Sequence, residues 1–275
     1  MRTISPSKFS VSGGCCKFLD LLCDKKGGKF SNKHGKRDSR QNQDSGQRAG
    51  DIVHEIVQYA LDGDDKNQRN ERIGKIIEII SEIKSKFDIK DYLDEIIGEK
   101  KHLKGVMHDQ TISKIVEETI PLINSANKLL RYLEKKIPDS ENKWLVTSEE
   151  NTKGINNVKI KIMQEEMTSY GKIDLVFQYK NNVIIGELKT GTPEEYKIKK
   201  WRLQTQLMRK SWEIKHQNDK ILATFIINSE LPNGRLIVNG TNAIDNIENQ
   251  NRDDVFPGYH CRNCPEKYIC NSAEI

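Results

Sequence analysis

The sequence contains no uninterrupted run of about 20 apolar residues, the length that a membrane-spanning helix requires. Its first residues, MRTISPSKFS, also lack the apolar stretch of a secretory signal peptide. Both absences predict an intracellular, cytoplasmic protein with no membrane partner. No internal repeat is present.

Large apolar side chains are nearly absent from residues 25–48, which hold eight Lys or Arg against two Asp. Such a segment cannot bury enough surface to offset its ordering entropy, so we expect a flexible basic loop. Contact with phosphates and a plain solvated insertion are both open for it. The whole chain is 35% apolar and 31% charged, with a formal net charge of +5. This mild excess suits a polyanionic partner without requiring one.

Apolar spacing predicts helices in the first half of the chain. One begins near Gly50 and carries apolar residues through Leu61, and residues 64–70 break it. Residues 71–137 read as helical in three segments, and Pro121 should bend or split the last of them.

The pattern becomes that of strands from about residue 143. Expected strands cover residues 143–147, 157–164, 172–179, 183–189, 221–228 and 234–238. A helix is expected over residues 194–216, apolar on two opposed sides, which is typical of a helix held between two layers.

The segment GKIDLVFQYKNNVIIGELKTG, residues 171–191, reads as a hairpin that turns at Asn181-Asn182. With that turn, Val176 would face Glu187 and Asp174 would face Lys189. Side chains alternate along a strand, so Asp174, Glu187 and Lys189 should project from one face. The two carboxylates would be diagonal neighbours, roughly 7–8 Å apart at the backbone, and could share a cation.

This grouping suits the hydrolysis of a phosphodiester. A hard divalent cation neutralises the developing charge and lowers the pKa of a bound water. Mg²⁺ and Mn²⁺ prefer carboxylate oxygens, and a lysine beside the metal can orient the nucleophile. The alternative is a surface Glu–Lys pair that contributes little. The Gly-x-x-Asp before the turn and Thr190-Gly191 after it favour the site.

Cysteines cluster near the two ends of the sequence. In a reducing compartment the six cysteines read better as metal ligands than as disulfides. The tail, residues 252–275, holds three at a spacing that reaches one centre, and a tetrahedral site needs a fourth. Zinc and an iron–sulfur cluster both suit four thiolates. The tail ligands would be Cys261, Cys264 and Cys270, joined by Cys15, Cys16 or Cys23.

GKID followed by GELKTG resembles the RecB-type branch of the PD-(D/E)xK nuclease superfamily. The resemblance implies a mixed α/β, restriction-endonuclease-like core with helices on both faces, as a single domain over residues 1–275. Residues 64–137 would be an N-terminal helical insertion. It also implies a Mg²⁺- or Mn²⁺-dependent deoxyribonuclease that hydrolyses DNA phosphodiesters with an activated water.

The same resemblance implies roles for individual residues. Gly50-Asp51-Ile52-Val53-His54 fits the family's G-x-x-x-H pattern, which would make His54 a metal ligand. It would join Asp174, Glu187 and the carbonyl of Leu188, while Lys189 assists the attacking water. Gln206-Leu207 fits the family's Q-L, so Gln206 would hold substrate or the lysine, although Lys210 stands where a tyrosine is usual.

One early cysteine with three at the end resembles the iron–sulfur subset of these nucleases, which includes CRISPR-associated exonucleases and AddB-type DNA repair nucleases. Ser5-Pro6-Ser7 and Cys15-Cys16-Lys17-Phe18 fit the early part of the pattern. The resemblance therefore favours a [4Fe–4S] cluster over zinc and Cys15 over Cys16 or Cys23. It also implies exonuclease action on single-stranded or end-bearing DNA, with a helicase or CRISPR integration proteins as partners.

Two other functions stay open on the sequence alone. One is a non-catalytic module that binds nucleic acid without cleaving it. The other is a zinc-stapled scaffold for a helicase or an integration complex.

Overall fold

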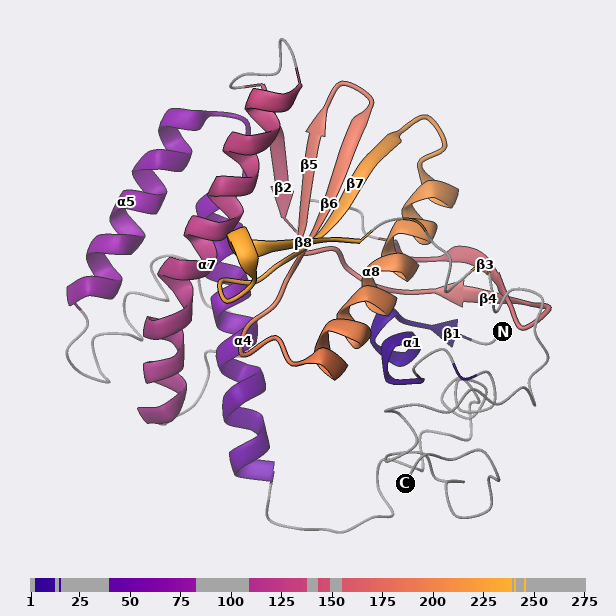
Figure 1. Cartoon of the computed structure of the whole chain (residues 1–275), viewed down its shortest axis with the longest axis horizontal. Helices are drawn as coiled ribbons and strands as arrows, with labels where there is room; N and C mark the ends of the chain where they lie inside the picture. Colours follow the sequence, from indigo (N-terminus) through magenta and orange to yellow (C-terminus); the bar gives the residue numbers. More distant parts are fainter. Residues whose placement is uncertain are drawn as a thin grey trace.

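The computed structural model describes residues 3–12, 15, 40–82, 109–137, 143–148, 155–238, 240 and 245. Within these ranges the chain has a mixed α/β fold, as the sequence predicted, with helices around a central five-stranded sheet (Figure 1). The cysteine-rich tail and residues 25–39 of the expected basic loop lie outside the described residues. In the described part of the chain, no helix is long and apolar enough to cross a membrane.

The central sheet has the strand order β2-β5-β6-β7-β8. Strands β6 and β7 run parallel, while the other neighbouring pairs are antiparallel. The parallel pair is joined by the long helix α8, Glu195–Lys215. The strands are β2 (Leu145–Ser148), β5 (Leu175–Tyr179), β6 (Asn182–Leu188), β7 (Lys220–Ile227) and β8 (Arg235–Val238).

A smaller three-stranded sheet has the order β1-β4-β3, with β1 at Thr3–Ile4, β3 at Val158–Ile162 and β4 at Glu165–Ser169. The short helix α1, Pro6–Ser12, follows β1. Strand β3 lies within the strand expected over residues 157–164, and the chain then turns at Met163-Gln164 into β4, a strand that was not expected. Both turn residues have positive φ, 53° and 60°, as a type I′ turn requires. Met-Gln lacks the Asn or Gly that signals such a turn.

The first long helix, α4, spans Arg40–Leu61 and so begins well before Gly50. Residues 40–48, expected as part of a loop, are therefore helical. The next helix, α5, spans Lys66–Glu82, so the expected break over residues 64–70 was too long. Asp65 begins α5 because its Oδ1 accepts the main-chain N–H groups of Asn67 at 2.7 Å and Gln68 at 3.2 Å.

Helix α7, Asp109–Lys136, continues through Pro121 and is not split there. A proline inside a helix costs about 3 kcal/mol. Burying one large aliphatic side chain contributes roughly 1.5–3 kcal/mol. Leu122 and Ile123 beside the proline are buried, so packing offsets the lost hydrogen bond.

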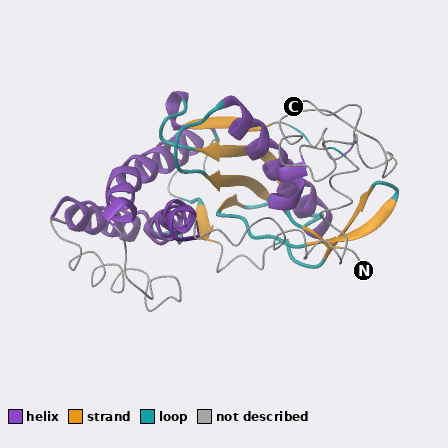
Figure 2. Cartoon of the chain, turned by 90° about the horizontal axis from the view of Figure 1, so that it is seen from below, coloured by secondary structure: helices purple, strands orange, loops and turns teal. Residues whose placement is uncertain are grey.

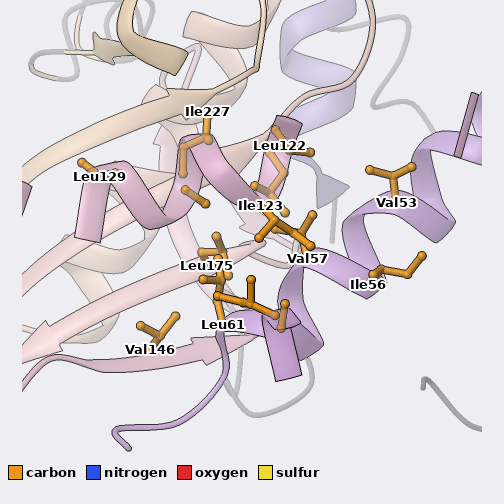
Figure 3. Packing of buried hydrophobic residues seen from close by; sticks show 14 of the residues in the cluster. Val53, Ile56, Val57, Leu61, Leu122, Ile123, Leu129, Val146, Leu175 and Ile227 are labelled. Atoms are coloured by element: carbon orange, nitrogen blue, oxygen red, sulfur yellow. The ribbon is translucent and has the colours of Figure 1, made fainter. Parts of the chain in front are cut away.

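Helices α4 and α7 pack on one face of the central sheet. Val53, Val57 and Leu61 of α4 meet Leu122 and Ile123 of α7 and the strands beneath them (Figure 3). Residues of α7 therefore share one core with the central strands, while the helical insertion expected over residues 64–137 stays a prediction. The apolar residues expected on α4 are all fully buried: Ile52, Val53, Ile56, Val57, Ala60 and Leu61.

Helix α8 covers the opposite face, so helices lie on both sides of the strands (Figure 2). Leu207 and Met208 pack in a second core with Ile185 of the central sheet and Ile160 of the smaller one. Trp201 packs in a third cluster with residues of β7 and β8. The expectation that α8 lies between layers is confirmed.

Candidate active site

The hairpin of β5 and β6 turns at Lys180-Asn181, one residue earlier than expected. Val176 pairs with Ile185 and Tyr179 with Asn182, so the predicted pairing of Val176 with Glu187 was wrong. Lys180 supplies the positive φ, 55°, that an asparagine was expected to supply.

The pairing is displaced by two residues, which leaves every side chain on its predicted face. The last pair of the ladder joins Leu175 to Gly186. One further step in that register sets Asp174 opposite Glu187 instead of diagonal to it. The two carboxylates therefore belong to the same end and the same face of the hairpin.

Helix α4 brings His54 to Asp174. The imidazole Nδ1 lies 3.6 Å from Asp174 Oδ2, within ion-pair range and just beyond a hydrogen bond. The same Oδ2 accepts the main-chain N–H of Leu188 at 2.8 Å, which ties Asp174 to the end of β6. The side chains of His54 and Asp174 are only 20% and 12% exposed, so solvent screens this contact weakly.

Gly50 explains how α4 can approach so closely. A Cβ atom at Gly50 would lie 2.9 Å from Thr190 Oγ1, closer than side chains tolerate. Gly191, which follows Thr190, has a φ of +75°, which favours glycine. The glycines of the G-x-x-x-H and Thr-Gly patterns therefore have steric roles at the site.

Glu187 is buried, at 2% exposure. Its Oε1 accepts hydrogen bonds from Lys189 Nζ at 2.5 Å and from Gln204 Nε2 at 2.6 Å. Its Oε2 is buried and has no hydrogen-bond partner among the described residues. Burial, and after it the negative charge of Asp174, raises the pKa of Glu187 from 4.5 to about 7, against the opposing effect of Lys189.

Gln204, two residues before Gln206, donates from Nε2 to Glu187 Oε1. Both lie on α8. Side chains two positions apart on an α-helix point about 200° apart, so Gln206 faces away when Gln204 faces Glu187. Gln204 is therefore a second candidate for the role expected of Gln206, which stays a prediction.

The segment after β6 is held in place by two residues that the sequence analysis did not identify. Asn228, 1% exposed, donates from Nδ2 to the carbonyls of Lys189 at 3.0 Å and Gly191 at 2.8 Å. Glu118 of α7 accepts the N–H of Gly191 through Oε2 at 3.2 Å. No local pattern marks either residue, since Asn228 comes to this place only through the parallel pairing of β6 and β7.

The donor set can be tested for its fit to a divalent cation. Among the described residues, no three His, Cys, Asp or Glu side chains already form a closed ligand group. Two donors that bind one cation at about 2.1 Å each lie about 3–4 Å apart, and the His54–Asp174 separation falls in that range. A buried carboxylate oxygen without a partner is costly, and a cation would satisfy Glu187 Oε2. The residues present therefore fit a divalent cation.

The remaining predicted ligands fall outside what the structure tests. The N–H of Leu188 binds Asp174, while its carbonyl stays a predicted ligand. Cys15 is buried. The other cysteines, Cys16, Cys23, Cys261, Cys264 and Cys270, lie outside the described residues, so the cluster stays a prediction.

No protein-family model matches the chain, and no curated protein is similar enough in sequence to count as a relative. The function is therefore proposed from the geometry of the site and from the sequence motifs described above.

Proposed function

We propose that this chain is a divalent-cation-dependent nuclease that hydrolyses DNA phosphodiester bonds, built on a RecB-like PD-(D/E)xK core. The observation that carries the proposal is Glu187. This buried carboxylate sits beside Asp174 and Lys189 and keeps one oxygen without a hydrogen-bond partner among the described residues. Buried carboxylates with raised pKa values gather at functional sites, so the placement of Glu187 supports a catalytic or binding role.

Mg²⁺ or Mn²⁺ would be held by His54, Asp174 and Glu187, with the Leu188 carbonyl as a further ligand. The bound cation would neutralise charge on the phosphate and lower the pKa of the attacking water. Gln204 and Lys189 both donate to Glu187 Oε1, so Oε2 is the oxygen that would bind the cation. Leu188 N–H holds Asp174 Oδ2, the oxygen that lies near His54 Nδ1, in a fixed position.

Lys189 would act on the reacting groups. Its ammonium is held against Glu187, and its side chain is 15% exposed, so its charge acts in a poorly screened place. The main chain at Lys189 is fixed on both sides, since its N–H donates to Ile227 at 2.9 Å and its carbonyl accepts from Asn228. A preorganised cation of this kind stabilises charge that develops on the phosphate or orients the water.

The sheet supports the restriction-endonuclease-like assignment. The carboxylates lie on an antiparallel hairpin, β5-β6, which is followed by α8 and the parallel strand β7. By the family resemblance, the substrate is single-stranded or end-bearing DNA and the action is exonucleolytic. A [4Fe–4S] cluster on Cys15, Cys261, Cys264 and Cys270 completes the proposal.

The test is digestion of end-labelled single-stranded DNA with Mn²⁺, comparing wild type with Glu187→Gln and Lys189→Ala. Each variant should lose at least about 100-fold in rate, as removal of one electrostatic stabiliser typically does. Glu166→Gln is the matched control, because Glu166 pairs with Lys159 at 2.8 Å on the surface. Binding of DNA without cleavage in any divalent cation would instead favour the non-catalytic module.

A further inference from the structure

One face of α8 is apolar where it covers the sheets and basic near the start of the helix. Where it covers the sheets it carries the buried residues Leu207 and Met208. Gln204, on the same face, reaches Glu187. Toward the start of the helix, the positions four and seven residues before Gln204 are Lys200 and Lys197, so both lysines share that face. The apolar stripe thus becomes basic just beyond the site.

These lysines accompany an exposed aromatic ring. Tyr196 is 42% exposed, and Lys197 Nζ and Lys200 Nζ lie 5.9 Å and 5.8 Å from its ring centroid. Lys197 Nζ also donates to the Thr192 carbonyl at 3.2 Å, which restrains the group. The first turns of α8 project past the ends of the central strands (Figure 1).

We propose that Tyr196, with Lys197 and Lys200, is a stacking platform that holds an unpaired base of a single-stranded DNA whose backbone continues to Glu187. The proposal rests on the proposed nuclease function and adds how the strand is held. Aromatic rings beside lysines bind single strands, because every base has a face that stacks and every nucleotide a phosphate that attracts ammonium groups. Inside a duplex, both faces of each base are stacked on neighbouring base pairs, so the platform selects unpaired nucleotides.

The spacing joins the platform to the candidate active site. Eight residues separate Tyr196 from Gln204, about 12 Å along the helix axis. Neighbouring nucleotides of one strand can bridge that length. Lys200 lies between Tyr196 and Gln204 on the helix, so its charge would lie beside the DNA backbone that joins the platform to the site.

A second tyrosine provides a matched control. Tyr132 is 39% exposed and also has two cations over its ring, Arg235 at 4.6 Å and Lys136 at 5.9 Å. It lies on α7, about 21 Å along the helix from Glu118, which contacts Gly191 at the site. If exposure and neighbouring cations alone decided, both tyrosines would contribute equally to binding of single-stranded DNA. The proposal expects a contribution from Tyr196 only.

The experiment measures binding of a single-stranded oligonucleotide that carries 2-aminopurine, whose fluorescence falls on stacking. The full chain with Glu187→Gln is the background, so no cleavage intervenes. Adding Tyr196→Ala should weaken binding about tenfold or more and abolish the quenching, while Tyr196→Trp should retain both. Tyr132→Ala should stay within about twofold, and binding to blunt duplex should not depend on Tyr196. Thermal unfolding checks that each variant is folded.

Two results separate this inference from the nuclease proposal. If Tyr196→Ala and Tyr132→Ala bind the single strand alike, while wild type still cleaves DNA, the platform alone is wrong. If Tyr196 is required for binding but wild type cleaves nothing with any divalent cation, the platform stands and the nuclease proposal fails.

Discussion

The Nδ1 atom of His54 lies 3.6 Å from Oδ2 of Asp174, although 120 positions separate the two residues in the sequence. Helix α4, which carries His54, is held against the sheet by fully buried Val53 and Val57. Because interiors are closely packed, the imidazole cannot move far from the carboxylate. The contact is therefore a preformed half of the proposed cation site.

Replacement of His54 by alanine should weaken Mn²⁺ binding by tenfold or more, because one ligand is lost. Titration calorimetry with metal-depleted protein measures the change directly. His216→Ala is the control, since His216 stacks on Trp212 at 4.1 Å and has no part in the proposed site. Equal Mn²⁺ affinity in both variants would remove His54 from the site.

The stability of the metal-free protein should depend on pH through Glu187. Its pKa rises from 4.5 to about 7 on folding, so the folded state favours the protonated form. This contribution to stability is fully present below pH 4.5 and is lost as the pH rises through 7. The loss amounts to about 3 kcal/mol at most.

Urea unfolding of wild type and Glu187→Gln at pH 5 and pH 8 isolates this effect from the other titrating groups. Wild type should lose more stability than the variant between the two values. Mn²⁺ should restore wild type at pH 8, because it neutralises the carboxylates, and should do little for the variant. A difference between the two proteins that does not change with pH would contradict the assignment.

Gly50→Ala should disturb the site although alanine is the better helix former. Its Cβ would lie 2.9 Å from Thr190 Oγ1, so either α4 or the segment after β6 must shift. Overpacking of this kind costs about 1–3 kcal/mol, and the shift should also weaken Mn²⁺ binding. Gly74→Ala on α5 is the control, because nothing lies within 4 Å of the added Cβ. That control should gain up to about 1 kcal/mol in unfolding free energy.

A second substitution makes the Gly50 prediction specific. Thr190→Ala removes the hydroxyl that the new Cβ would meet. Combined with Gly50→Ala, it should recover most of the lost stability and Mn²⁺ affinity. A double variant as impaired as Gly50→Ala alone would show that the clash lies elsewhere.

Local patterns in the sequence predicted the central strands and the placement of Asp174, Glu187 and Lys189 on one face. They did so because alternation along a strand survives an error of two residues in the pairing. The hairpin β3-β4 was missed, since Met163 and Gln164 adopt positive φ against their usual preference. Asn228 could not be found at all, because its contacts depend on which strands become neighbours.

The choice between Gln204 and Gln206 shows the same limit. A sequence can place both on one helix but cannot say how that helix is rotated over the sheet. Gln204→Ala should reduce the rate of DNA cleavage more than tenfold, since it releases Glu187 Oε1. Gln206→Ala should have the smaller effect. Both rates are measured as kcat on the same oligonucleotide. A larger loss in Gln206→Ala than in Gln204→Ala would assign the role to Gln206.

The cysteines supply a prediction that does not depend on the hairpin. If Cys15, Cys261, Cys264 and Cys270 hold a [4Fe–4S] cluster, anaerobically purified protein should be brown and contain about four iron atoms per chain. Cys15→Ser should lose the iron, whereas Cys16→Ser and Cys23→Ser should keep it. Because the cluster would close a loop of most of the chain, its loss should also lower the midpoint of thermal unfolding. Colourless protein with one zinc per chain would replace the cluster by a zinc site on the same thiolates, and iron retained in Cys15→Ser but lost in Cys16→Ser would move the fourth ligand by one residue.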